Sequence, residues 1–286
     1  MKTVVRSLPA FEVDMGGIPV YQPFPTNNVE QIDPFLLLHH SKFSLEGGVN
    51  PLHTGIGPHP HRGFMPVTYV ISGELHHRDS LGNSSIIGAG GAQWLNAGSG
   101  VTHSERPSAK FAKEGGSTEL IQLWVNLPKA NKMSAPNYKG VSKEEIPSIE
   151  IADGLTFDLI SGLYDSQWGA IRSPIPLLIG AVEALKDATG ELILPTGMQG
   201  GLYMINGEGS IFGYGIVEEK TLYQVSSGED NLKISLDQGA KALLILGRPI
   251  HEPLATYGPF VMNTQTEIMK SLRDYNHGKM GVLIEE

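Results

Sequence analysis

Two short stretches of the chain, His59-Pro-His61 and His103-Ser-Glu105, carry side chains that could bind a metal ion. In an extended chain, residues i and i+2 project from the same face. Each pair can therefore direct two ligating atoms at one point, and two neighbouring strands would place three imidazoles and one carboxylate around one ion. Nitrogen and oxygen ligands without thiolate suit Fe, Mn, Co, Ni or Zn, and an octahedral ion would keep two open positions.

Not every histidine in the sequence is expected to bind metal. A single His-x-His pair often arises by chance, and isolated histidines are usually satisfied or solvated. Here both pairs lie next to glycine-rich turns, in a segment (53–103) that holds six of the ten histidines. We therefore expect one metal site, with His59, His61 and His103 as its imidazole ligands and Glu105 as its carboxylate. The expected non-ligands are His39, His40, His53, His76, His77, His251 and His277.

The composition excludes several classes of protein. With 40% hydrophobic and 18% charged residues, the chain can bury a core and is not disordered. It contains no cysteine, so disulfides, thiolate zinc sites, iron–sulfur clusters and a cysteine nucleophile are all excluded. A formal charge of −9 repels phosphate backbones and anionic lipids, so we expect neither direct nucleic-acid binding nor membrane binding.

The first residues do not resemble a signal peptide, because Arg6, Pro9 and Glu12 interrupt any apolar run. No stretch of the sequence approaches the roughly 18 apolar residues of a membrane span. We therefore expect a cytoplasmic protein.

The elements that would position the site are short strands. Apolar, β-branched runs at 67–71, 120–125, 202–205 and 242–246 are bounded by Gly, Pro, Asn or Ser. Glycine clusters at 88–91 and 98–100 separate further runs. This pattern predicts an all-β sandwich or barrel. One longer helix is predicted at 264–277, where Thr264 and Glu267 have capping-box spacing and Gly278 follows the last turn.

The length of 286 residues allows two domains or one large all-β domain. An internal repeat favours two: Tyr-x-Ile-x-Gly-Glu begins at Tyr69 and again at Tyr203. We expect domains at 1–130 and 148–286, joined by a polar, proline-containing linker at 131–147. The offset of the repeat maps the metal-ligating positions of the first domain onto Ile193, Pro195, Asp237 and Gly239. Only the first domain is therefore expected to bind metal.

Several longer motifs resemble those of the pirin family. They lie at 57–64 (Gly-Pro-His-Pro-His-Arg-Gly-Phe), 67–69, 98–105, 122–127 and 258–264, with a similar N-terminal segment at 33–38. The resemblance implies a bicupin, with two facing β-barrel or β-sandwich (jelly-roll) domains and a short C-terminal helix. It also implies one mononuclear iron, as Fe(II), in the N-terminal domain. Its implied ligands are the same His59, His61, His103 and Glu105.

Two functions follow from this resemblance. Some pirins resemble quercetin 2,3-dioxygenases, which open the ring of a flavonol with O2. Others resemble non-enzymatic, iron-dependent regulators that bind a transcription factor or a metabolic enzyme. Metal-dependent oxygen consumption and CO release with quercetin would distinguish the enzyme from the regulator.

The sequence departs from the family at two adjacent positions. Pirins usually continue His-Arg-Gly-Phe with Glu-Thr, whereas this chain has Met65-Pro66. Any mechanism that needs a second carboxylate beside the metal is therefore in doubt. Glu105 becomes the one expected carboxylate ligand and the candidate catalytic base, and Gln122, Trp124 and Asn126 are candidates to orient the ligands.

Overall fold

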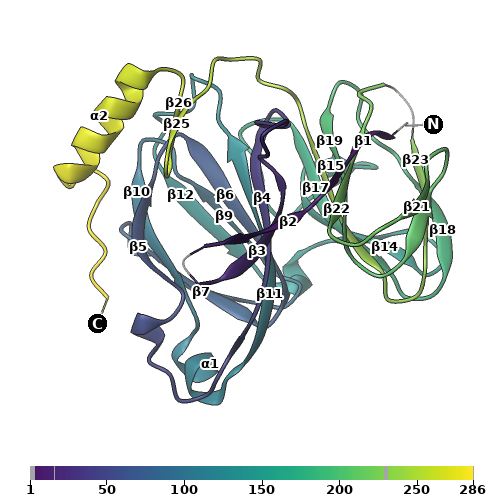
Figure 1. Ribbon diagram of the computed structural model, residues 1–286, viewed down its shortest axis with the longest axis horizontal. Helices are drawn as coiled ribbons and strands as arrows, with labels where there is room; N and C mark the ends of the chain where they lie inside the picture. Colours follow the sequence, from purple (N-terminus) through teal and green to yellow (C-terminus); the bar gives the residue numbers. More distant parts are fainter. Residues whose placement is uncertain (1–3, 16, 229–230, 286) are drawn as a thin grey trace. The chain divides into compact units, whose positions relative to one another are not determined.

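Strands dominate the computed structural model of the protein, which describes residues 4–15, 17–228 and 231–285 (Figure 1). The predicted all-β fold with one short C-terminal helix is confirmed. The strands predicted at 67–71, 120–125, 202–205 and 242–246 all form. No helix in these described ranges combines the length and the apolar character needed to cross a membrane.

The elements of the chain have the following bounds: β1 (Val4–Pro9), β2 (Phe11–Asp14), β3 (Pro19–Phe24), β4 (Phe35–Leu45), η1 (Pro51–His53), β5 (Ile56–His61), β6 (Phe64–Ser72), β7 (Glu74–Asp79), β8 (Ser84–Gly88), β9 (Ala92–Asn96), β10 (Val101–Arg106), α1 (Ala109–Glu114), β11 (Gly116–Asn126), β12 (Asn137–Val141), η2 (Lys143–Glu145), β13 (Ser148–Ala152), β14 (Leu155–Ser161), β15 (Leu163–Tyr164), β16 (Gln167–Trp168), β17 (Leu177–Ala184), β18 (Ala188–Leu192), β19 (Gln199–Asn206), β20 (Gly209–Ile211), β21 (Gly215–Val217), β22 (Thr221–Val225), β23 (Leu232–Leu236), β24 (Lys241–Gly247), β25 (Ala255–Tyr257), β26 (Phe260–Met262) and α2 (Gln265–Asn276).

The chain forms two compact units, and neither is one continuous segment. Asp14–Val20, His39–Lys143 and Ile250–Glu286 make up the histidine unit, which holds all ten histidines. Met1–Val13, Tyr21–Leu38 and Glu144–Pro249 make up the histidine-free unit. Strands β2, β3 and β4 contribute residues to both units.

The histidine-free unit is a sandwich of two antiparallel sheets. The larger has the order β1-β22-β19-β24-β17-β14-β13 and the smaller the order β18-β23-β20-β21. One apolar cluster joins them, with Leu155 and Leu244 from the larger sheet and Leu192, Ile234 and Leu236 from the smaller. Because alternate residues of each strand point inward, this cluster is the buried core of the unit.

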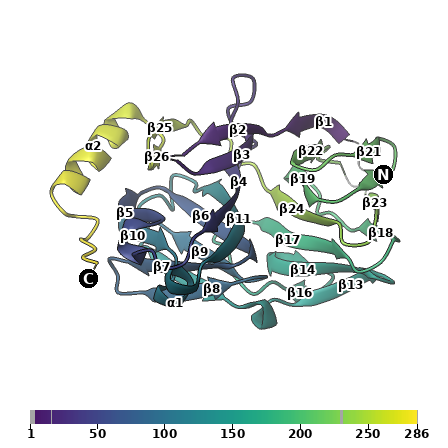
Figure 2. The same ribbon diagram turned by 60° about the horizontal axis from the view of Figure 1, so that its bottom comes forward.

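The histidine unit has the same arrangement. A sheet with the order β12-β9-β6-β11-β4-β3-β2 is paired with a four-stranded sheet, β5-β10-β7-β8. β5, β10 and β7 lie beside one another in both views (Figure 1 and Figure 2). The sheets are separate ladders and sandwich-like rather than closed barrels.

The internal repeat occupies equivalent places in the two units. Tyr69 lies in β6 and Tyr203 in β19, which are central strands of the two larger sheets. The repeated glycine follows each strand at a turn, with φ of +73° at Gly73 and +82° at Gly207. Residues other than glycine rarely adopt such angles, which explains the glycine in both copies.

The helix α2 begins and ends as its sequence predicts. The Thr264 hydroxyl accepts a hydrogen bond from the backbone N–H of Glu267 at 3.2 Å, and the Glu267 carboxylate accepts one from the N–H of Asn263 at 3.1 Å. Ile268 and the partly buried Leu272 pack against Phe260, Met262 and Met280. The apolar face of α2 is thereby docked within the histidine unit.

Candidate metal centre

Two adjacent strands bring the predicted histidines together. β5 pairs with β10 in antiparallel register, and His59 lies directly opposite His103. His61 follows two residues later on the same face of β5, as the alternation of an extended chain requires. Among the described residues, His59, His61 and His103 form the one group whose ligand atoms all lie within 4.8 Å of one another.

The spacing of these imidazoles suits a single ion. The Nε2 atoms of His59 and His61 are 3.1 Å apart, and the ring of His103 lies 4.4 Å from that of His59 and 4.8 Å from that of His61. Two nitrogens each about 2.1 Å from one ion lie about 3.0–3.4 Å apart at octahedral or tetrahedral angles. The Nε2 atom of His103 is buried and has no hydrogen-bond partner in the described structure. An ion is the partner that this donor set fits.

Burial keeps two of the rings neutral. His61 and His103 are almost completely buried. Burial, together with the neighbouring histidines, holds the pKa of each well below its ordinary value. A metal ligand must offer an unprotonated nitrogen, so these environments prepare both rings for coordination.

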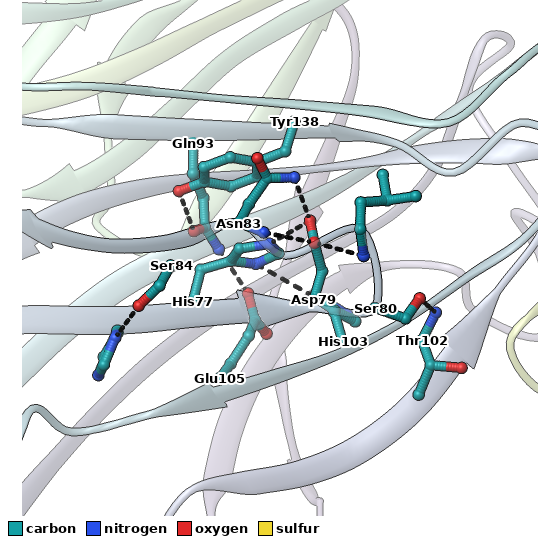
Figure 3. Close-up of polar contacts among 12 residues, drawn as sticks. His77, Asp79, Ser80, Asn83, Ser84, Gln93, Thr102, His103, Glu105 and Tyr138 are labelled. Carbon is teal, nitrogen blue, oxygen red and sulfur yellow. Dashed lines mark hydrogen bonds and ion pairs between the residues drawn. The ribbon is translucent and has the colours of Figure 1, made fainter. Parts of the chain in front are cut away.

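A chain of hydrogen bonds leads away from His103 (Figure 3). Its Nδ1 lies 3.4 Å from Nδ1 of His77, and Nε2 of His77 lies 3.1 Å from Oδ2 of Asp79. A carboxylate only accepts hydrogen bonds, so His77 presents an Nε2–H to Asp79. The neutral His77 ring can then accept from Nδ1–H of His103, which leaves the lone pair of His103 on Nε2. Asp79 thus selects the ligating tautomer of His103.

The carboxylate of Asp79 is itself held by the turn after β7. It accepts hydrogen bonds from the backbone N–H groups of Leu81 and Asn83 and from the Asn83 side chain. Burial raises the pKa of Asp79, but the hydrogen bonds from His77 and Asn83 outweigh this effect and lower it overall. The ring of Tyr138 stacks on His77 with centroids 4.0 Å apart. The stacked Tyr138 ring thus contacts the face of the His77 imidazole, and Asp79 holds its Nε2–H at the ring edge.

Glu105 lies on β10 but is not a member of the histidine group. The register between β10 and β5 shifts at a bulge: His103 pairs with His59, whereas Glu105 pairs with Ile56. Gln93 donates to Oε1 of Glu105 at 2.6 Å and Gln122 to Oε2 at 2.8 Å, with Thr68 at 3.5 Å. Glu105 is therefore a buried carboxylate held by two side-chain amides, and Figure 3 shows the contact with Gln93.

Two aromatic residues orient these amides. The Tyr138 hydroxyl donates to Oε1 of Gln93 at 3.3 Å, and burial raises the pKa of this phenol to about 12, so that it keeps its proton. The indole N–H of Trp124 donates to Oε1 of Gln122 at 3.2 Å. Each amide therefore turns its NH2 group toward Glu105. Gln122 and Trp124, two of the candidates to orient the ligands, thus hold the carboxylate of Glu105, and their role toward a metal stays a prediction.

Asn126, the third candidate, has a different partner. Its carbonyl oxygen accepts a hydrogen bond from the Lys132 ammonium at 2.6 Å, and the same ammonium donates to the carbonyls of Gly63 and Val261. Burial lowers the pKa of Lys132 to about 8. This contact joins backbone segments next to the site and does not reach the histidine rings.

Met65, at the family's usual glutamate position, faces away from Glu105. In the register of β6, Thr68 pairs with Gln122 and Gln93, and all three contact Glu105. Met65 has the opposite parity, and its sulfur accepts a hydrogen bond from the indole of Trp94 at 3.3 Å. The methionine therefore does not replace any of the side chains that hydrogen-bond Glu105.

A cavity of about 90 Å³ lies beside Glu105 and Gln122. Its wall includes the apolar residues Ile18 and Phe43 together with His39. Burial lowers the pKa of His39 to about 4, so that this ring is neutral near pH 7. The cavity gives a small molecule access to the carboxylate.

Sequence reasoning missed several residues that hold the candidate ligands in place. Gln93, Thr68 and Tyr138 carried no motif. His77 and Asp79 were visible as a His-x-Asp pair in a strand, with the same i, i+2 spacing that identified His59 and His61. That spacing is the signal that could have found them.

The chain is similar to known proteins along most of its sequence. Residues 17–125 match the family model described as Pirin, and residues 181–281 match the one described as Pirin C-terminal cupin domain. A Pseudomonas aeruginosa protein named "Putative quercetin 2,3-dioxygenase PA3240" is 35% identical over 283 residues, covering 94% of each chain. Pirin-1 of Arabidopsis thaliana is 35% identical over 259 residues, covering 87% of this chain and 84% of its own.

A solved structure extends the similarity to the whole fold. The crystal structure of a quercetin 2,3-dioxygenase from Acinetobacter baumannii superposes with a TM-score of 0.92 at 34% identity. It covers 99% of this chain and 100% of its own. Both units are therefore cupin domains.

Proposed function

The chain belongs to the pirin family, and from this premise we propose that it is a mononuclear metal-dependent dioxygenase that opens the ring of a flavonol such as quercetin with O2. The observation that carries the proposal is the buried group of His59, His61 and His103, with an unpartnered Nε2 on His103. The names of the Pseudomonas and Acinetobacter relatives support the reaction class.

The proposed ligands are the three histidines and Glu105, and Fe(II) is the proposed ion. Three neutral imidazoles and one carboxylate are a donor set that suits iron as well as Mn, Co, Ni or Zn. When bound, the ion would act as a Lewis acid and as an electron conduit between substrate and O2.

The residues of the chain would supply the remaining steps. Glu105 is the proposed base that takes the proton of the flavonol 3-hydroxyl, because it is a buried carboxylate two residues after His103 on β10 and lines the cavity. Gln93 and Gln122 hold its two oxygens in place before the substrate arrives. His39 lines the same cavity, and its neutral ring adds no charge to the cavity wall.

The size of the cavity limits how a flavonol would enter. Ligand pockets for molecules of this size usually enclose about 300–1,000 Å³, whereas this cavity encloses about 90 Å³. Only the edge of the ring that carries the hydroxyl and carbonyl oxygens would enter. The remaining rings would lie against the apolar rim formed by Ile18 and Phe43.

Metal analysis and turnover together test the proposal. Protein purified without metal supplementation should contain about one divalent ion per chain. With quercetin it should consume O2 and release CO, and a chelator should stop both. Protein that retains its metal but gives no oxygen uptake with quercetin would contradict the dioxygenase and favour a regulatory role.

Glu105→Gln tests the proposed role of the carboxylate. The substitution keeps the volume of the side chain but removes its charge and basicity. We expect loss of metal during dialysis and a fall in quercetin turnover of at least a hundredfold, since a general base contributes about 10²–10⁴-fold. Glu114→Gln, at an exposed glutamate of α1, is the matched control and should change neither. Full metal content with normal turnover in Glu105→Gln would refute the assignment.

A further inference from the structure

The outer face of β10 binds the C-terminal segment of the chain. Inward-facing His103 and Glu105 alternate with outward-facing Thr102, Ser104 and Arg106. The Thr102 hydroxyl donates to the carbonyls of Met280 at 3.3 Å and Gly281 at 3.1 Å. Residues 278–285, which we call the tail, follow α2 beside β5 and β10 (Figure 1).

The tail places a carboxylate in a prepared cleft. The Glu285 side chain accepts a hydrogen bond from the Ser104 hydroxyl at 2.6 Å and another from Nε of Arg106 at 2.8 Å. The exposed fractions of the Arg106 and Glu285 side chains are 12% and 7%, so the ion pair is largely desolvated. The other arm of Arg106 is fixed by the carbonyl of Thr54 at 2.9 Å. Arg106 is thus held in position to receive a carboxylate.

Glu285 does not use the whole cleft. A space of about 180 Å³ is lined by Glu285 together with His76, Arg78 and Arg106. Arg78 forms no ion pair with any residue that the structure describes, so one carboxylate faces two guanidinium groups. Among the residues that line the cleft, guanidinium groups therefore outnumber carboxylates, and the space has room for a second acidic group.

The tail itself is loosely held between its two anchor points. Val282 and Ile284 are 71% and 78% exposed, and residues 281–285 form no strand or helix. The contacts of Glu285 are therefore separate from those of Met280 and Gly281. Loss of the Glu285 contact requires no rearrangement of α2 or of the sheet.

We propose that this cleft is a binding site for the carboxylates of an extended acidic peptide segment of a partner protein, and that Glu285 occupies it as an internal ligand that such a segment displaces. We expect the partner segment to resemble the tail, in which the apolar residues 282–284 precede Glu285. A second acidic residue of the partner would face Arg78.

Glu285 competes with an external peptide for the cleft and so lowers the apparent affinity of that peptide. A group tethered by a short flexible segment acts at an effective concentration on the order of millimolar. Removing the Glu285 carboxylate should therefore tighten the binding of an external acidic peptide at least tenfold.

A labelled peptide tests the proposal on the full-length protein. The probe has the sequence of residues 279–285, Lys-Met-Gly-Val-Leu-Ile-Glu, with both ends blocked so that the glutamate is its one carboxylate. In fluorescence anisotropy, the Glu285→Ala and Glu285→Gln proteins should each bind it at least tenfold more tightly than the unchanged protein. Glu191→Ala, at an exposed glutamate of the histidine-free unit, should bind like the unchanged protein.

Further arms locate the binding and identify its chemistry. A probe with glutamine in place of the glutamate should lose at least tenfold in affinity for Glu285→Ala. Adding Ser104→Ala or Arg106→Gln to Glu285→Ala should have the same effect. Equal binding by all proteins, or binding that survives both added substitutions, would overturn the proposal. So would free glutarate that binds as tightly as the peptide, because the site would then recognise a small dicarboxylate. None of these measurements requires metal or turnover.

Discussion

At the scale of single residues, His103 offers a lone pair on Nε2 only while His77 directs its own Nε2–H at Asp79. An asparagine at position 79 could present an NH2 group to His77 instead of an oxygen. His77 would then accept at Nε2 and carry its proton on Nδ1. The proton of His103 would move to Nε2, where the ion should bind.

Asp79→Asn should therefore weaken metal binding by about 10–100-fold, the usual effect of removing a carboxylate behind a ligating histidine. Titration of the metal-free protein with Fe(II) or Zn(II) measures this change. Asp153→Asn, at a highly exposed aspartate in the histidine-free unit, is the control and should leave the affinity unchanged. Unaltered affinity in Asp79→Asn would show that Asp79 does not select the tautomer.

The clustering of the three histidines was predictable from the sequence, whereas the residues that contact them were not. His59 and His61 share a face because of a period that any strand obeys, so two residues of sequence suffice. Gln93 meets Glu105 because β9 pairs with β6, and no local pattern specifies that pairing. The expected place of Glu105 among the ligands remains a prediction.

At the scale of elements, one buried ion pair docks α2 beside the site. The guanidinium of Arg62, next to His61, donates to Asp274 at 3.0 Å, and their side chains are 4% and 6% exposed. The hydrogen bonds from Lys279 and Arg62 lower the pKa of Asp274 to about 2. A depressed carboxyl pKa stabilises the folded state at every pH above its unfolded value near 4. That contribution is lost as the pH falls from about 4 to about 2.

Asp274→Asn should loosen α2, because it removes the negative charge that faces a buried guanidinium, and breaking a buried ion pair costs about 3–5 kcal/mol. Hydrogen exchange of α2 amides should speed up strongly near pH 7. Lys279→Ala is the matched comparison: its ammonium is 61% exposed, so its ion pair with the same aspartate is worth at most about 1 kcal/mol. Equal exchange rates in the two variants would argue against the buried pair as the anchor.

Local sequence signals were sufficient to predict the helix α2 but not the pairing of the strands. The capping box at Thr264 and the stripe of Ile268 and Leu272 are local, and both α2 and its docked face were predicted from them. Residues 137–141, within the segment interpreted as a linker, form β12 and pair with β9. This pairing, like that of β1 with β22, joins residues far apart in the chain, and no short-range pattern specifies it.

At the scale of the whole molecule, the two cupin domains share a strand order but differ inside. In the four-stranded sheets, β10 and β23 occupy the same place. β10 carries His103 and Glu105, whereas β23 carries the buried Ile234 and Leu236. These apolar side chains of β23 have no atoms that could bind a metal ion at that place in the second domain.

Metal should accordingly stabilise one domain and leave the other unchanged. An ion at a hundred times its Kd adds about 2.7 kcal/mol to the stability of the state that binds it. Hydrogen exchange of β5, β10 and β7 should slow when metal is added to chelator-treated protein. Exchange of β18, β20 and β23 supplies the internal control. Slowing of both sets would point to a general effect, and slowing of neither would contradict the metal centre.

The repeat around Tyr69 and Tyr203 was enough to predict two similar domains, because each copy marks a central strand and its glycine turn. The way the chain divides between the units was not visible. Residues 1–13 and 21–38 cluster with the histidine-free unit although residues 39–143 follow them directly. Such interleaving depends on contacts between distant segments, which composition and periodicity do not encode.

The pairing of His59 with His103 across β5 and β10 sets a rule for insertions and deletions in this chain. The connection between the two strands contains β6, β7, β8 and β9, and only the turns between these strands can lengthen at small entropic cost, since loop closure depends only weakly on length. One residue added or lost inside either strand would turn the following side chains to the opposite face. Loss of one residue of β10 directly after Thr102 would put the Ser104 hydroxyl in the place of the imidazole, and both faces of the strand would lose their side chains in one step.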